Sequence, residues 1–243
     1  MTSYGPLAAF YDRLTEDVDY RAFADRYEAA FRKDGGEFRL LLDLCCGTGS
    51  LSREMTCRGY EMISVDASEA MLMEAREKCA ELAVPPLFLC QDAAGLDLYG
   101  TVDAAFCSLE AINYLAPEDV ESLLRRLRFF IRPGGLFLFD MRSPAFLRSL
   151  DGGTFVDEDE DLLCLWRSDY DEELGALIHG MDLFSREGGL WRREREEHVE
   201  YAHDPERLAK LLEEWGFEKP EIRLEEDRLH VTARRRGGTG VQI

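Results

Sequence analysis

The chain has 243 residues, of which 46% are hydrophobic and 32% are charged, as is usual for a globular protein with a sizeable core. It has no run of about 18 apolar residues and no basic segment followed by an apolar one near its start, so we expect neither a membrane span nor export. The formal net charge of −20 argues against nucleic acid as a partner, because non-specific affinity for nucleic acid comes from neutralising phosphates.

The seven cysteines indicate a reducing environment. Their number is odd, none belongs to a Cys-x-x-Cys pair, and Cys45 and Cys46 are adjacent, which suits neither a disulfide framework nor a zinc site. We therefore expect a cytoplasmic protein that holds no metal and exists as a monomer or a homodimer.

The predicted elements begin with a helical run over residues 21–33, preceded by a segment rich in aromatic residues that includes Tyr4, Tyr11 and Tyr20. Such side chains most simply pack a helix against the rest of the protein. No internal repeat or low-complexity linker separates this segment from the rest of the chain.

A buried strand over 40–44 then runs directly into a glycine turn. Gly47 and Gly49 let the backbone approach a ligand without a Cβ in the way, and a helix that starts at Ser50 offers unpaired N–H groups. Asp43 lies just before the turn, where a carboxylate repels a pyrophosphate but attracts an ammonium group. The segment therefore favours S-adenosylmethionine over a dinucleotide as its ligand.

The next two predicted strands also lead into acids. The strand over 60–66 ends in Asp66, where a carboxylate can accept hydrogen bonds from both hydroxyls of a ribose. An acid at the end of a buried strand needs a partner, so a purely structural explanation of Asp66 is weak. The third apolar run, over 86–90, leads into Asp92, which can take the amino group of an adenine.

Two more strands are predicted over 102–107 and 135–140, and the second of them is preceded by a turn over 132–135. The spaced motifs over about residues 38–142 resemble those of class I S-adenosylmethionine-dependent methyltransferases. The resemblance implies an α/β fold with a doubly wound, Rossmann-like sheet of five parallel strands and an antiparallel C-terminal hairpin.

The resemblance also implies where the cofactor lies. The turn from Cys45 to Gly49 would hold its methionine end together with Asp43, Asp66 would bind the ribose, and Cys107 would lie beside the methyl donor. We expect the following cofactor-binding residues: Tyr11, Tyr20, Asp43, Cys45, Cys46, Gly47, Thr48, Gly49, Asp66, Ala67, Met71, Gln91, Asp92, Ala93 and Cys107. The family usually has glycine or alanine where Cys45 stands, so we expect an ordinary negative φ at this cysteine.

The N-terminal segment resembles the lid of a group of small bacterial methyltransferases that also carry an Asn-Tyr-Leu segment after the fourth strand, here residues 113–115. Sugar and small-amine N-methyltransferases are relatives of that group. The resemblance implies that residues 1–36 form a helical lid whose aromatic side chains close over the cofactor. Packing of the lid helix is the competing explanation for Tyr11 and Tyr20.

Beyond the fifth strand we expect a helix over 143–150 and a solvated acidic loop over 157–161. Three strand-like segments then form an antiparallel meander that extends over the carboxyl ends of the parallel strands, at 163–170, 174–186 and 190–201. A helix capped by Asp204 and a hairpin over 218–224 and 228–235 come next. The expected division is a lid over 1–36, a core over 37–150 and 202–236, and an inserted meander over 151–201.

Methyl transfer from a sulfonium needs mainly alignment and desolvation, and it needs a base only when the acceptor arrives protonated. Glu110 follows the fourth strand and can accept a proton, although a solvated loop carboxylate is an equally good explanation. His198 can act as a base near neutral pH if it faces the pocket, although a histidine in a strand is more often a surface or pairing residue. Glu110 and His198 are therefore the candidate catalytic residues.

We expect a small-molecule acceptor with an amine or a hydroxyl group, and no nucleic-acid or membrane partner. The alternative is methylation of tRNA or protein through a local patch, for which residues 234–236 form the only run of three basic side chains. An NAD-type oxidoreductase is a further alternative, but Gly47-x-Gly49-x-x-Ser52 lacks a third small residue. A non-catalytic cofactor-binding protein also stays open, because fold does not fix function.

Overall fold

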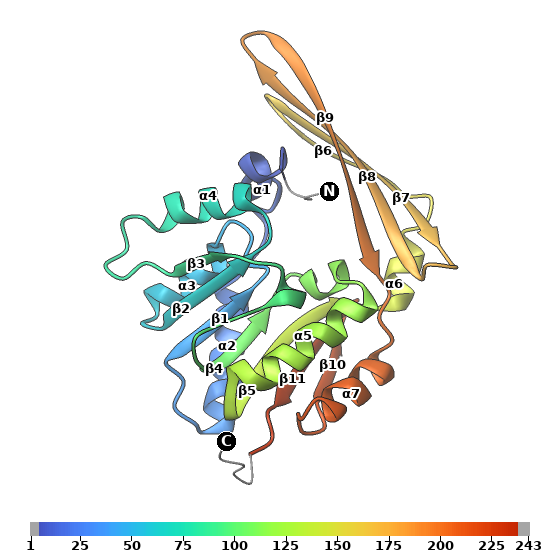
Figure 1. Ribbon diagram of the computed structural model, residues 1–243. Helices are drawn as coiled ribbons and strands as arrows, with labels where there is room; N and C mark the ends of the chain where they lie inside the picture. Colours follow the sequence, from blue (N-terminus) through green and yellow to red (C-terminus); the bar gives the residue numbers. More distant parts are fainter. Residues whose placement is uncertain (1–4, 238–243) are drawn as a thin grey trace.

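The computed structural model describes residues 5–237, so Tyr4 of the expected lid lies outside the described residues. A seven-stranded sheet with helices on both faces forms the core, and a four-stranded antiparallel sheet, the meander, projects above it (Figure 1). Within residues 5–237, no helix combines the length and the apolar character that a membrane span requires.

The core sheet has the strand order β10-β11-β5-β4-β1-β2-β3. Five strands run parallel, namely β1 (Leu40–Leu44), β2 (Glu61–Asp66), β3 (Leu87–Cys90), β4 (Val102–Cys107) and β5 (Ile131–Arg142). The hairpin of β10 (Glu221–Glu225) and β11 (Arg228–Arg234) joins the sheet antiparallel to β5. The predicted fold class is confirmed, and the strand order changes direction between β1 and β4, where such sheets bind ligands.

Helices cover both faces of this sheet. One face packs against α5 (Pro117–Phe130) and α7 (Pro205–Glu214), and the other against α2 (Tyr20–Asp34) and α3 (Ser50–Cys57). The remaining helices are η1 (Ala8–Phe10), α1 (Tyr11–Leu14), α4 (Glu69–Cys79), η2 (Ala93–Gly95), η3 (Ala111–Tyr114) and α6 (Pro144–Ser149). Side chains of Asp19, Ser68 and Asp204 cap α2, α4 and α7 by accepting from backbone N–H groups in the first turn.

The turn expected at 132–135 is part of β5 and forms an irregularity within the strand. Val102 pairs with Ile131 but Ala104 pairs with Leu136, so four residues of β5 lie opposite the single residue Asp103. Gly135 is required here, because a Cβ at this position would lie 2.4 Å from the carbonyl oxygen of Asp103.

The meander has four strands rather than three: β6 (Thr154–Asp159), β7 (Leu162–Asp171), β8 (Ala176–Glu187) and β9 (Leu190–Tyr201). The prediction of a solvated acidic loop was wrong for residues 157–159, which belong to β6. All six residues of β6 are exposed, so this edge strand has no burial pattern, and its backbone pairing with β7 holds it in place.

One face of the meander, here called its inner face, packs on the N-terminal segment. Leu7 forms a buried cluster with Leu162, Cys164, Met181 and Leu183 of the meander. Aromatic side chains of η1 and α1 pack against the same cluster, and Arg13 of α1 forms an ion pair with Asp159. The N-terminal segment and the meander therefore lie together over the carboxyl ends of the parallel strands.

Candidate functional site

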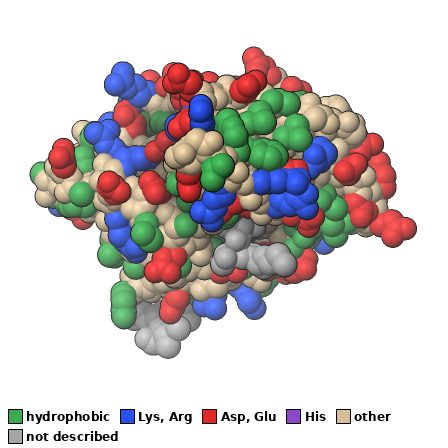
Figure 2. All heavy atoms as spheres, turned by 90° about the horizontal axis from the view of Figure 1, so that it is seen from above, with side chains coloured by type: hydrophobic (Ala, Val, Ile, Leu, Met, Phe, Trp, Pro, Cys, Tyr) green, Lys and Arg blue, Asp and Glu red, His purple; other side chains and the backbone are tan. Residues whose placement is uncertain are grey.

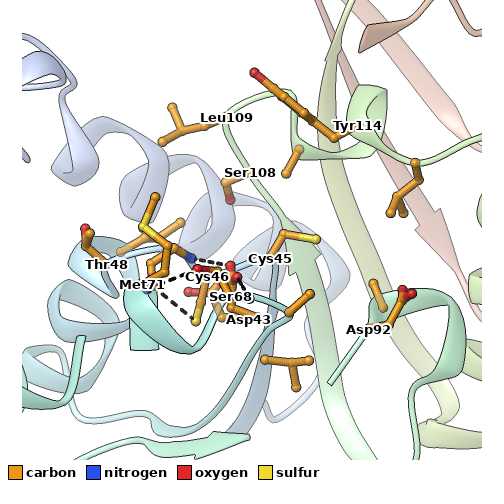
Figure 3. A pocket seen from close by; sticks show the side chains of 18 of the residues that line it. Asp43, Cys45, Cys46, Thr48, Ser68, Met71, Asp92, Ser108, Leu109 and Tyr114 are labelled. Atoms are coloured by element: carbon orange, nitrogen blue, oxygen red, sulfur yellow. Dashed lines mark hydrogen bonds between the residues drawn. The ribbon is translucent and has the colours of Figure 1, made fainter. Parts of the chain in front are cut away.

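A cavity of about 540 Å³ opens at the carboxyl ends of β1, β2 and β4, below the N-terminal segment and the meander. Figure 3 shows its side chains converging from the turn after β1, the start of α4 and the segment after β4. Of the fifteen expected cofactor-binding residues, thirteen line the cavity: Tyr11, Tyr20, Asp43, Cys45, Cys46, Gly47, Thr48, Asp66, Ala67, Met71, Gln91, Asp92 and Ala93. Gly49 and Cys107 are not among the lining residues, although their neighbours in the sequence, Thr48 and Ser108, are.

The turn after β1 is built from three residues with positive φ: 55° at Cys45, 52° at Gly47 and 71° at Gly49. The expectation of a negative φ at Cys45 was wrong, because the chain must turn sharply enough for the Cys46 N–H to reach the carbonyl oxygen of Val65 at 3.0 Å. The left-handed conformation costs a non-glycine residue roughly 1–2 kcal/mol, and here the surrounding sheet imposes it.

The two glycines of the turn serve different purposes. A Cβ on Gly49 would lie 2.9 Å from the Cβ of Ala75, so this glycine lets α3 and α4 pack closely. A Cβ on Gly47 would meet nothing within 4 Å, and Gly47 lines the cavity. The open side of Gly47 is therefore the part of the turn that a ligand can approach.

Asp43, the last buried acid before the turn, is only 2% exposed and accepts a hydrogen bond from Ser52 Oγ at 2.5 Å. Burial raises the pKa of Asp43 to about 7, although the bond from Ser52 opposes the shift. A cationic group in the cavity would favour the ionised carboxylate and stabilise it.

Asp66 is held at the end of β2 by two backbone hydrogen bonds, since Gly47 N–H donates to Oδ2 and Ser68 N–H to Oδ1, each at 2.8 Å. Burial raises its pKa, while these N–H groups favour the charged form. Each carboxylate oxygen has a second lone pair, so both can still accept from ligand hydroxyls.

The far end of the cavity, next to β3, carries two acids. Asp92 accepts from Ala94 N–H at 2.9 Å, which fixes it at the start of η2. Asp119, in the first turn of α5, was not anticipated, and burial together with the nearby Asp92 raises its pKa. Gln91 bonds through both of its amide atoms to the backbone of Asp97, which orders the loop around this end.

Tyr11 and Tyr20 reach the cavity from the N-terminal segment, and burial raises the pKa of both hydroxyls. A polar contact holds this segment down: Lys78 Nζ of α4 lies 2.6 Å from Asp12 and 2.9 Å from Thr48 Oγ1. Thr48 Oγ1 in turn donates to Asp12 at 2.6 Å. Lys78 therefore joins α1 to the glycine turn.

The segment after β4 is strained. Leu109 and Glu110 both have positive φ, at 55° and 50°, and Asp140 accepts from their N–H groups at 3.0 and 2.9 Å. Ser108 and Leu109 line the cavity, and Ser108 Oγ lies 2.6 Å from the hydroxyl of Tyr27. Backbone strain of this kind often occurs where a site must be held in one geometry.

The structure places neither candidate base in the cavity wall. The Glu110 carboxylate turns to Arg228 and Arg142, and burial raises its pKa against the effect of these two arginines. His198 is 2% exposed on the inner face of the meander, with Nε2 at 3.1 Å from Oε2 of Glu196. Cys107 is fully buried, and its pKa is raised by a contact with the thiol of Cys45 and by burial.

Several lining residues were not anticipated. Glu197, Val199 and Tyr201 of β9 border the cavity. Their spacing of two puts them on one side of the strand, so the alternation within 190–201 was the available signal. The alternation also places His198 on the opposite side, together with Glu200.

All charged side chains that line the cavity, among the residues that the structure describes, are carboxylates: Asp43, Asp66, Asp92, Asp119 and Glu197. A wall of this kind suits a cationic ligand. S-Adenosylmethionine fits it, since the molecule carries a sulfonium and an ammonium group as well as ribose hydroxyls and an adenine amine. The glycine-lined approach at Gly47 and the acids at the ends of β1 and β2 provide complementary contacts.

Comparisons with known proteins agree with this geometry. A family model described as a methyltransferase domain matches residues 41–135. A protein named as a methyltransferase, YqeM of Bacillus subtilis (strain 168), is 31% identical over 88% of this chain and 86% of its own length. The crystal structure of an S-adenosylmethionine-dependent methyltransferase from Clostridium acetobutylicum ATCC 824 is 26% identical, with a TM-score of 0.84 over 98% of this chain and 100% of that one.

A second solved structure shows the same fold. The sugar N-methyltransferase KedS8 from Streptoalloteichus sp ATCC 53650 has a TM-score of 0.79 at 24% identity, over 93% of this chain and 92% of that one. The extensive match to YqeM, the matched methyltransferase domain and the acidic cofactor cavity together establish the family. The chain belongs to the class I S-adenosylmethionine-dependent methyltransferases.

Proposed function

We propose that this enzyme transfers the methyl group of S-adenosylmethionine to the nitrogen of a small amine that enters the cavity as an ammonium ion. One observation carries the proposal: the charged side chains that line the cavity, within the described part of the chain, are all carboxylates. Asp43, Asp66 and Asp92 are assigned to the cofactor, and Asp119 lies near Asp92 at the far end of the cavity. Glu197, which lies on the meander, is the carboxylate that remains on the acceptor side. A carboxylate at that position attracts a cationic acceptor.

The cofactor takes the core side of the cavity in this proposal. Asp43 binds its ammonium group, Asp66 its two ribose hydroxyls and Asp92 its adenine amine. The depth of Asp43, the two N–H bonds that fix Asp66 and the place of Asp92 at the start of η2 support these roles. Bound there, the cofactor supplies an activated methyl group, so the protein mainly has to align the acceptor and exclude water.

The acceptor takes the opposite side, between the segment after β4 and the meander. Ser108, Leu109, Tyr114, Glu197 and Tyr201 border this space. Residues 1–36 act as a lid and residues 151–201 as a cover that selects the acceptor, over a core formed by 37–150 and 202–236. Packing of the N-terminal segment on the inner face of the meander supports this division.

Nitrogen is favoured over oxygen as the acceptor atom for two reasons. An ammonium ion is attracted and stabilised by an anionic wall, whereas a neutral hydroxyl group carries no charge for the wall to attract. The fold neighbour KedS8 is named as a sugar N-methyltransferase. Glu110 and His198 do not border the cavity, so the proposal gives neither of them contact with the acceptor.

A methyl-transfer screen tests the proposal. Labelled S-adenosylmethionine is incubated with the enzyme and separate acceptor pools: cationic metabolites, neutral and anionic metabolites, total tRNA, and protein lysate. We expect label in the cationic pool, and the labelled product should carry its methyl group on nitrogen by mass spectrometry.

Each other outcome contradicts a stated part of the proposal. Label only in the neutral or anionic metabolites argues for a hydroxyl or carboxyl acceptor. Label only in tRNA or protein argues for a macromolecular substrate that docks over the cavity. Glu197→Gln is the matched variant: it should raise KM for the amine while leaving S-adenosylhomocysteine affinity within about twofold of the wild-type value.

A further inference from the structure

A polar network of buried side chains lies on the inner face of the meander, behind the acceptor side of the cavity. The Ser168 hydroxyl lies 2.8 Å from Nδ1 of His179, and Nε2 of His179 lies 3.0 Å from Oε1 of Glu200. The exposed fractions of Ser168, His179 and Glu200 are 1%, 9% and 8%. These residues come from the neighbouring strands β7, β8 and β9, so the sheet holds them in line.

Tyr114 connects this polar network to the cavity. Its hydroxyl donates to the same Oε1 of Glu200 over 3.5 Å, and its side chain lines the cavity. Figure 3 shows the ring of Tyr114 extending from η3 on the same side of the cavity as Ser108 and Leu109, far from Asp92. Glu200 itself is not in the cavity wall, so Tyr114 is the group that links it to a bound acceptor.

The His179–Glu200 pair of the polar network has different contacts from the other histidine–carboxylate pair on the inner face. Glu196, the partner of His198, also accepts from Leu7 N–H at 3.0 Å, which anchors the N-terminal segment. Glu200 bonds instead to a side chain of the cavity wall. Burying a carboxylate and an imidazole costs free energy that an apolar pair would not, so packing alone does not explain why they stand there.

We propose that Glu200 and His179 form a proton-accepting pair that receives a proton from the ammonium acceptor through the hydroxyl of Tyr114, an inference that rests on the amine acceptor proposed above. The ammonium N–H bond breaks as its proton passes to the Tyr114 oxygen, and the phenolic proton passes to Oε1 of Glu200. The nitrogen lone pair then forms the N–C bond while the S–C bond breaks and its electron pair stays on sulfur. Tyr114 ends neutral, and the pair holds the added proton.

The proton between His179 and Glu200 belongs to His179 in the resting enzyme. Two unprotonated acceptors 3.0 Å apart would repel each other, so Nε2 donates to the ionised Glu200 while Nδ1 accepts from the Ser168 hydroxyl. This tautomer stabilises the carboxylate and leaves Glu200 able to accept the phenolic proton. The proposal therefore requires the Nε2–H tautomer in the resting enzyme.

Several charged or titratable side chains lie around Glu200. His179 faces it from β8, Tyr114 from η3, and Glu196 and His198 lie along the same face of β9. Glu110, from the segment after β4, is close enough for its charge and that of Glu200 to repel each other.

Nitrogen-15 NMR of the imidazole rings tests the tautomer without any acceptor or cofactor. The chain has four histidines, so the spectrum of a His179→Gln variant assigns the signals of His179. We expect a protonated Nε2 and an unprotonated Nδ1 in the wild-type enzyme, and Ser168→Ala, which removes the donor to Nδ1, should shift the Nδ1 signal. A wild-type His179 with its proton on Nδ1 and none on Nε2 would overturn the proposal, because Glu200 would then already carry the proton that it is proposed to accept.

Steady-state kinetics with the amine found in the screen test the relay itself. Glu200→Gln keeps the side-chain shape and removes its basicity, so kcat should fall roughly 10²–10⁴-fold while the KM for the amine stays within about twofold. The loss should shrink above the pKa of the acceptor, because the amine is then already neutral. Tyr114→Phe should lower kcat similarly, and the double variant should lose little more, since the two residues act in one path.

Glu194→Gln is the matched control. Glu194 lies on the same face of β9 and pairs with Arg192 at 2.8 Å, so its substitution should leave kcat and its pH profile unchanged. S-Adenosylhomocysteine binding shows that each variant still folds its cofactor site. A wild-type enzyme that labels no amine contradicts the proposed function, whereas an active wild type with kcat of Glu200→Gln within about threefold at every pH contradicts the relay alone.

Discussion

Asp66 is the side chain whose loss should weaken cofactor binding most directly. It is fixed by two backbone N–H groups and still presents both oxygens to the cavity. Asp66→Ala removes the acceptor of two ribose hydroxyls and should cost roughly 1.5–3 kcal/mol, or about tenfold to a hundredfold in affinity for S-adenosylhomocysteine. Calorimetric titration measures the change, with the exposed Asp97→Ala as the control. Unchanged affinity in a folded Asp66→Ala variant would place the ribose elsewhere.

Asp43 should make cofactor binding depend on pH near neutrality. Burial raises its pKa to about 7 in the free enzyme, and an ammonium group next to it favours the carboxylate. At a pH of about 6 roughly a tenth of Asp43 is ionised, so S-adenosylhomocysteine should bind about tenfold more weakly than at a pH of about 8, with proton release. Asp43→Asn should bind weakly at both pH values. A wild-type affinity that is the same at both would contradict the contact.

The same shift affects the free enzyme in the opposite direction. The folded pKa of Asp43 lies above its unfolded value of 3.8, so its contribution to stability is complete below that pH and is lost as the pH rises through about 7. As the pH rises through about 7, ionisation of Asp43 should therefore strengthen cofactor binding and lower the stability of the free enzyme.

At the residue scale, the sequence predicted which carboxylates line the cavity better than it predicted the backbone conformation around them. Asp43 and Asp66 stand out because an acid at the end of an apolar strand needs a partner. The positive φ of Cys45 follows from the path of the backbone and not from the residue type, and no rule for cysteine gives it. The direction of the His198 side chain depends on how the meander packs, and this buried side chain lies outside the cavity wall.

At the scale of elements, Lys78 ties the lid to the cofactor turn. Its ammonium group bridges Asp12 of α1 and Thr48, so Lys78→Met should loosen α1 without unfolding the core. The partly exposed ion pair is worth roughly 1 kcal/mol, so S-adenosylhomocysteine should dissociate about fivefold faster in stopped-flow measurements. Arg76→Met, on an exposed position of the same helix, is the control. Equal dissociation rates in the two variants would mean that α1 closes without this contact.

The packing of α3 against α4 depends on Gly49. Gly49→Ala and Gly47→Ala both place a side chain at positive φ, which costs roughly 1–2 kcal/mol in each case. Only at Gly49 does the new Cβ meet a neighbour, at 2.9 Å from Ala75, so this variant should lose about 1–3 kcal/mol more. Urea unfolding of the apoproteins compares the two free energies. Equal losses would show that α4 moves aside at no cost.

The core sheet was predictable as a set of elements, and the meander only in part. Apolar runs that end in acids or turns identify β1 to β5, whereas β6 is exposed along its whole length and carries three of the acids of the 157–161 run. Its strand conformation comes from pairing with β7, a tertiary contact that no local pattern encodes.

At the scale of the whole molecule, charge is the property that separates the acceptor classes. The face seen from above carries Asp and Glu side chains mixed with Lys and Arg, without a broad basic surface (Figure 2). The basic run at 234–236 is partly engaged, since Arg234 pairs with Asp34 and Arg235 donates to the carbonyl oxygen of Ile131.

The densest basic group in the meander surrounds Asp182. Arg167, Arg193 and Arg195 all pair with this carboxylate, which is 1% exposed. Although burial opposes it, these arginines lower the pKa of Asp182 to about 2. Asp182 thus neutralises part of the positive charge that would be needed to bind a phosphate backbone.

The enzyme should therefore not bind tRNA. With a net charge of −20 and the arginines around Asp182 paired with that carboxylate, it should show no saturable binding to total tRNA up to about 100 μM protein at physiological salt, the weak end of non-specific binding. Fluorescence anisotropy with labelled tRNA measures this, and lowering the salt should not reveal binding. Affinity that rises steeply as salt falls, and that Arg193→Ala with Arg195→Ala abolishes, would identify the arginines around Asp182 as a docking site. That result would also replace the small amine with tRNA as the acceptor to be tested first.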